Sequence, residues 1–236
     1  HRIVSVIFMK LKLGRNQSLP DIVFNCAMIA FSLFWNGFGI YLTIKANIGV
    51  SPWDVLNMGF VHTFGILYGT ASISVALTIL GIDIFMGETI GVAMIIDAFV
   101  VGKSVDFFNY IDIVQTPSSL FGSILLMLIG LVIIGYTQYL YMASAMGCGP
   151  RDTLLVGLKR IFKNIPIGVV SICMLSIATL VGYVLGGPVG IGTLISAFCA
   201  GPIMQKEFEL MHFDATTIRH QNIKETIHIL THKNGQ

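Results

Sequence analysis

The chain has 236 residues, of which 55% are hydrophobic and 11% are charged, with a formal net charge of +2. Soluble domains carry about 25% charged residues, so this chain lacks the polar side chains that would cover a surface facing water. Its mean hydropathy of +0.82 excludes an ordinary soluble domain and predicts a polytopic helical membrane protein.

Residues 1–19 are basic, and no cleavage-site pattern leads from them into a mature soluble domain. We interpret them as a cytoplasmic lead-in rather than a signal peptide. Six apolar runs follow, several of them near the roughly 20 residues that a helix needs to cross the bilayer. They lie at 21–43, 66–82, 89–102, 119–143, 167–185 and 189–205. We expect an all-α protein with about six transmembrane helices and a polar cytoplasmic tail at 207–236.

The pattern G-x-[S/G]-P-x-D-x-L occurs twice, after the first and after the fourth apolar run. It reads NIGVSPWDVL at 47–56 and AMGCGPRDTL at 145–154, and its main residues are Ser51, Pro52, Asp54, Gly149, Pro150 and Asp152. The Ser or Gly fits a helix N-cap, the Pro fits the first helical position, and the Asp at the third can accept backbone N–H groups. Each motif therefore predicts a short helix, at 52–64 and 150–163, that is interfacial or re-entrant.

An alternative use of the motifs is a shared site that the two helix starts approach from opposite membrane faces. A carboxylate at each start would weaken anion binding, so the ligand would be a cation or a proton.

The motifs belong to an internal repeat. The halves 20–110 and 117–206 align at an offset of 98 residues, which becomes 99 after one inserted residue. The aligned pairs include Gly37–Gly135, Gly49–Gly147, Pro52–Pro150, Asp54–Asp152, Gly59–Gly157, Gly69–Gly168, Gly91–Gly190 and Gly102–Gly201. Three spans in each half is an odd number, so the second half enters the membrane from the opposite side. This predicts an inverted-topology repeat, which is common in secondary transporters.

The basic residues orient these spans, because Lys and Arg collect on the cytoplasmic side. With six spans and both termini cytoplasmic, only Lys45 and Lys103 of the 14 Lys and Arg residues fall outside. The basic helix at 150–163 suits anionic lipid rather than nucleic acid.

Three polar residues inside the predicted spans are candidates for a substrate path: Asp97, Asn36 and Gln138. An ionisable group at membrane depth is a functional candidate by default. For Asp97 the alternatives are a neutral, hydrogen-bonded carboxyl group or one near a span end that is paired with a neighbour. For the two amides the alternative is hydrogen bonding between helices. The four cysteines show no metal-ligand spacing, and the H-E-x-x-H and G-x-S-x-G patterns are absent. We therefore expect no metal, no cofactor and no enzymatic activity.

Three stretches resemble the YczE/YitT group of bacterial integral membrane proteins, and the YczE branch in particular. They are NIGVSPWDVLNMG, GCGPRDTLLVGL and GYVLGGPVGIGTLISAFCAGPIMQ. The resemblance implies a multi-pass protein of the bacterial cytoplasmic membrane, and it implies no substrate.

Two functions follow from these observations. The first is transport of a small solute or ion along a path between the inverted halves. The second is a membrane-embedded regulatory or scaffold protein that acts through a protein partner. A homo-oligomer is compatible with both.

Overall fold

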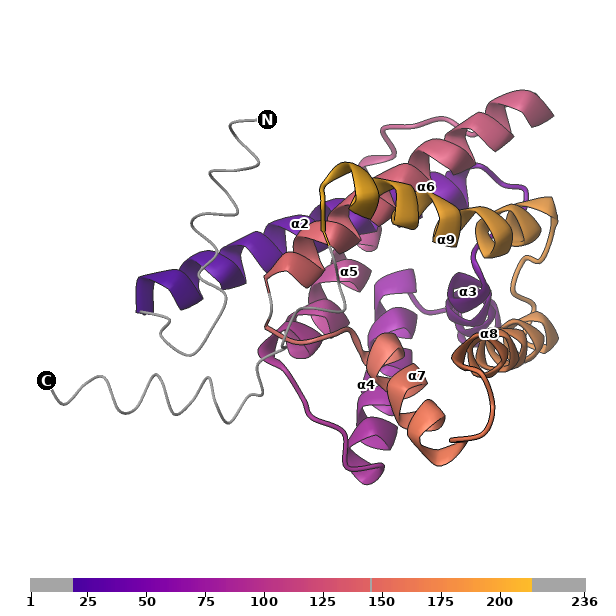
Figure 1. The fold of residues 1–236 in the computed structure, drawn as a ribbon. Coiled ribbons are helices and arrows are strands. Elements are labelled where there is room, and N and C mark those ends of the chain that lie inside the picture. The colour runs from indigo at the N-terminus through magenta and orange to yellow at the C-terminus, as the bar shows by residue number, and fades with distance from the viewer. Residues whose placement is uncertain (1–18, 145, 214–236) are drawn as a thin grey trace, which may run out of the picture.

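The computed structural model describes residues 19–144 and 146–213, and every regular element in them is a helix (Figure 1). This confirms the helical class. The helices are α2 (Leu19–Lys45), α3 (Pro52–Phe64), α4 (Tyr68–Phe85), α5 (Val92–Ile111), α6 (Leu120–Ala143), α7 (Pro150–Ile161), α8 (Ile167–Val184) and α9 (Ile191–Leu210). The predicted lead-in and most of the predicted tail lie outside the described residues, and α9 continues past position 207.

Four of the described helices, α2, α4, α6 and α8, are long and apolar enough to cross a membrane. Helices α5 and α9 occupy the third and sixth predicted spans and have 20 residues each, but they carry more charged residues. Lys103 and Asp106 lie within α5, and Lys206 and Glu207 lie within α9. The structure thus supports a helical membrane protein, and the count of six spans stays a prediction.

Small residues allow the long helices to approach closely. A Cβ added to Gly39 of α2 would lie 2.9 Å from the carbonyl oxygen of Gly130 on α6. A Cβ added to Gly102 of α5 would lie 2.9 Å from the carbonyl oxygen of Gly69 on α4. Packing of this kind holds membrane helices together where the hydrophobic effect does not.

The two short helices each pack on a helix of the other half of the chain. Helix α3 lies beside α8, and α7 lies beside α4 (Figure 1). The motifs that precede α3 and α7 are consequently held between the two halves, where the candidate site is found.

Candidate functional site

Two loop pairings fix where α3 and α7 begin. Gly192 donates its N–H to the carbonyl oxygen of Ile48 at 2.7 Å, and Ala93 donates its N–H to that of Met146 at 3.3 Å. Each bond joins the loop before a short helix to the start of the last helix in the other half.

Glycines make both pairings possible. A Cβ on Gly49 would lie 2.5 Å from the nitrogen of Gly190, and a Cβ on Gly147 would lie 2.8 Å from Cα of Gly91. Gly49 and Gly147 also have φ values of +100° and +126°, which side chains disfavour. The glycine-rich stretch 186–193 is therefore a turn and a packing surface.

The first motif begins α3 at the predicted positions, with Ser51 as N-cap and Pro52 in the first turn. The expected capping bond is absent. Asp54 is 2% exposed and accepts hydrogen bonds from Ser51 Oγ at 2.5 Å and from Tyr68 Oη at 2.6 Å. Asn57 Nδ2 also donates to Tyr68 Oη at 3.1 Å. The Asp54 carboxylate thus joins α3 to α4 instead of capping its own helix.

The second motif begins α7 with Gly149 as N-cap and brings two carboxylates together. A Cβ on Gly149 would lie 3.0 Å from Asp97 Oδ2, 3.6 Å from Asp152 Oδ2 and 3.9 Å from Tyr141 Oη. Gln138 Nε2 lies 3.4 Å from Asp152 Oδ2. The missing side chain at position 149 leaves room for Asp97, which comes from α5.

Arg151 joins the starts of the two short helices. Its guanidinium carbon lies 5.2 Å from the centre of the Trp53 ring, a cation–π contact between α7 and α3. The positive charge of Arg151 also interacts electrostatically with the side chains of Tyr68, Asp97 and Asp152. We call this group the central cluster, and its members are Trp53, Asp54, Tyr68, Asp97, Gln138, Tyr141, Arg151 and Asp152.

The central cluster has more negative than positive groups, because its three carboxylic acids face one guanidinium. Burial raises the pKa of Asp152, and Arg151 counteracts the rise. Burial and the nearby Asp152 charge raise the pKa of the Cys148 thiol to about 11. Asp97 accepts no hydrogen bond among the described residues, and the Tyr141 hydroxyl is buried without a partner there. A cluster with these unused groups could bind a cation or a proton.

Of the three residues predicted to line a path, two belong to the central cluster. The third, Asn36, donates to Thr137 Oγ1 at 3.0 Å and lies 3.4 Å from the carbonyl oxygen of Ile134. It therefore holds α2 against α6, which is the alternative role expected for it. Tyr68, Tyr141 and Arg151 were not predicted as site residues, because single aromatic and basic residues beside apolar runs carry no distinguishing pattern.

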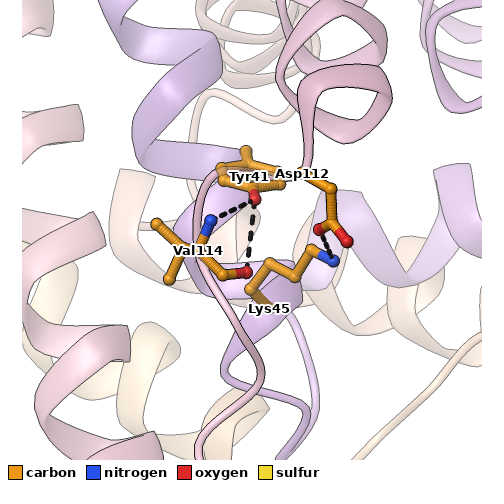
Figure 2. Close-up of polar contacts among 4 residues, drawn as sticks. All are labelled: Tyr41, Lys45, Asp112 and Val114. Carbon is orange, nitrogen blue, oxygen red and sulfur yellow. Dashed lines mark hydrogen bonds and ion pairs between the residues drawn. The ribbon is translucent and has the colours of Figure 1, made fainter.

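Lys45 lies away from the central cluster, at the end of α2. It forms an ion pair with Asp112, which ends α5, and lies 5.7 Å from the centre of the Tyr41 ring (Figure 2). The Tyr41 hydroxyl accepts the N–H of Val114 at 3.0 Å. The ion pair and the hydrogen bond together hold the end of α2 against the end of α5 and the loop that follows it.

Two of the basic residues near the end of α7 have partners within the protein. Lys159 donates to the carbonyl oxygens of Lys163 and Ile165, at 2.7 and 2.8 Å. Arg160 donates to the carbonyl oxygen of Met86 and lies 3.0 Å from a Glu88 carboxylate oxygen.

Comparison with known proteins places these motifs in a wider group. Residues 23–206 match the model of a family of unknown function, DUF6198. The uncharacterized membrane protein YczE of Bacillus subtilis is 30% identical over 71% of this chain and 78% of its own length. An uncharacterized protein of Haemophilus influenzae is 27% identical over 76% of this chain and 81% of its own. YyaS of Bacillus subtilis, also uncharacterized, is 25% identical over 72% and 89%. No solved structure matches.

Proposed function

The chain belongs to the family of unknown function DUF6198 and is a YczE-like membrane protein, and we propose that it transports a small cationic solute or protons. The path runs between two inverted halves, with the central cluster as the binding site. Its expected location is the bacterial cytoplasmic membrane.

The equivalence of contacts across the aligned positions supports the inverted repeat. The backbone of Gly49 packs against Gly190, and that of Gly147 packs against Gly91. The offset of 98 aligns Gly49 with Gly147, and the offset of 99 aligns Gly91 with Gly190, so the two contacts occupy equivalent positions in the repeat. The repeat also aligns α3 with α7 and α4 with α8, so the contact between α3 and α8 is equivalent to the contact between α7 and α4. A chain whose halves are related by a pseudo-two-fold axis requires such reciprocal contacts.

The Arg151–Trp53 contact favours re-entrant over interfacial short helices. The predicted topology puts the two motifs at opposite membrane faces, yet their first turns touch. Both helices must then begin at depth and run outward, as the broken helices of many transporters do.

The excess of acidic over basic groups in the central cluster is the observation that favours a cationic solute or protons. Three carboxylic acids and one guanidinium would repel an anion more than they attract it. Asp97 is the residue best placed to contact the solute, because its carboxylate meets no donor among the described residues. Asp54, whose oxygens both accept hydrogen bonds, has a supporting role.

A transport protein of this kind needs no covalent chemistry, and we propose that it is not an enzyme. The alternative role as a scaffold gains no specific support, since Lys159 and Arg160 of the basic helix bind internal groups.

Flux measurements in proteoliposomes test the proposal. The purified chain is assayed with protons, alkali cations and small organic amines, beside Asp97→Asn and the exposed control Asp112→Asn. We expect at least a tenfold loss of flux for Asp97→Asn with an unchanged Tm, and normal flux for the control. Absence of both flux and ligand-induced thermal stabilisation, in a folded protein, would refute transport and favour the scaffold role.

A further inference from the structure

A further buried acidic group, Asp83, lies outside both repeated motifs. Asp83 occupies the last turn of α4, and its side chain is 0% exposed. Neither carboxylate oxygen has a hydrogen-bond partner among the described residues. An ionised carboxylate there would lose its hydration without replacement. The negative end of the helix dipole adds to that cost.

The charged groups next to Asp83 do not compensate for its burial. Glu88 donates its backbone N–H to the carbonyl oxygen of Asp83 at 2.9 Å, which brings a second carboxylate close. Arg160 of α7 is a cation beside this turn, but it already pairs with Glu88 and the Met86 carbonyl. Lys159, the other base in this turn of α7, binds carbonyl oxygens just after the end of its own helix.

The other helices packed on α4 place their charged groups at its opposite end, apart from Asp97 of α5, which belongs to the central cluster. Asp106 of α5 accepts the N–H of Gly69, at the start of α4, at 2.8 Å. Asp54 of α3 binds Tyr68 in the same first turn. Lys103 of α5 lies next to Gly102, which packs on Gly69, and His62 of α3 lies beside Gly186. None of these groups is placed to neutralise Asp83.

We propose that Asp83 is a proton-binding site, separate from the central cluster, that holds α4 against α7 while the proton is bound. The aligned position in the second half is Gly182, whose backbone packs on Val55 and Leu56 of α3. Helix packing at this place therefore does not itself require an acid, and the carboxyl group of Asp83 is an addition to one half only.

The turn that follows Asp83 packs directly on α7, and through it the site acts on this helix. A Cβ on Gly157 of α7 would lie 2.7 Å from Met86 Cε and 3.1 Å from Glu88 Oε1. Release of the proton leaves a charge that must draw in water or Arg160, and either change loosens this contact. Arg151 and Asp152 lie in the first turn of the same helix, so proton release reaches the central cluster. Proton binding at Asp83 requires no transport activity.

Thermal unfolding of the full chain in lipid nanodiscs tests the site at about pH 5 and about pH 8. Burial disfavours the charged form only in the folded state, so stability falls as pH rises. The wild type should lose about 2–4 °C more in Tm than Asp83→Asn over this range, and the control Asp112→Asn should behave like the wild type. Asn imitates the protonated acid, so equal pH profiles or a misfolded Asp83→Asn variant would overturn the proposal.

Hydrogen exchange separates an effect on α7 from a general loss of stability. At about pH 8 the amides of 150–161 should exchange several-fold faster in the wild type than in Asp83→Asn, and at about pH 5 the two should agree. Comparison at one pH cancels the chemical dependence of exchange on pH. Equal exchange of α7 at both pH values would refute the coupling, and it would leave the flux experiment unaffected.

Discussion

Asp54 and Tyr68 form the most fully bonded polar pair of the central cluster. The carboxylate accepts from Tyr68 and from Ser51, and the tyrosine hydroxyl accepts from Asn57. All of these bonds are local to the first half of the chain. These bonds hold the start of α3 rigidly at the place where the Trp53 ring contacts the Arg151 guanidinium.

Removal of the Asp54 carboxylate should destabilise the protein by leaving the Tyr68 hydroxyl buried without its acceptor. We expect Asp54→Ala to cost about 1–3 kcal/mol in the free energy of unfolding and Ser51→Ala to cost less. Tyr68→Phe in the Asp54→Ala background should cost little more, because the two side chains share one bond. Unfolding of the wild type, Asp54→Ala, Tyr68→Phe and the double variant measures the coupling, and additive losses would contradict the pairing.

Single residues also show why the site could be predicted only in part. The repeated motif located Asp54 and Asp152 and the start of each short helix, because proline and glycine restrict the backbone locally. The sequence could not show that Gln138 contacts Asp152 in the site whereas Asn36 binds Thr137 away from it. Both are amides in apolar helices, and only the packing of α2, α6 and α7 decides which way each one faces.

At the scale of the elements, each of the six apolar runs overlaps a helix, and their ends differ for a physical reason. The run at 89–102 stops at Lys103, whereas α5 continues to Ile111. Asp106 interrupts the apolar pattern, yet its carboxylate accepts the N–H of Gly69 on the adjacent α4. A charge that looks like the end of a span is thus a contact between helices, which hydropathy alone cannot reveal.

The loop glycines give a prediction at this scale. Alanine at Gly49 or Gly147 combines a strained φ with a collision against backbone of the other half, so each should cost about 2 kcal/mol or more. Gly65 has a φ of +63° and open space around it, so Gly65→Ala should cost only about 1–2 kcal/mol.

A second control separates strain from crowding. Gly81 lies within α4 with nothing near it, and Gly81→Ala should be neutral or stabilising, by up to about 1 kcal/mol. Thermal unfolding of the four variants gives the ranking. If Gly49→Ala were no worse than Gly65→Ala, the pairing of the two halves through their loops would be wrong.

At the scale of the whole molecule, the contacts between distant segments agree with the predicted topology. With both termini cytoplasmic, Lys45 and Asp112 both fall outside, and they form an ion pair. Glu88 and Arg160 both fall inside, and they are also paired. If α2, α4 and α6 cross the membrane and α5 does not, the members of both pairs lie on opposite sides and neither ion pair can form.

Cysteine labelling in inverted and right-side-out vesicles tests this arrangement. The four native cysteines, Cys26, Cys148, Cys173 and Cys199, are replaced, and single cysteines are introduced at Asp112 and Lys159. An impermeant maleimide should label position 112 only from the outside and position 159 only from the inside, because one crossing, that of α6, separates the two along the chain. Labelling of both from one side would remove the odd number of crossings between them. The two halves could then not be inverted, and the equivalence of the loop contacts would have to arise from a parallel repeat.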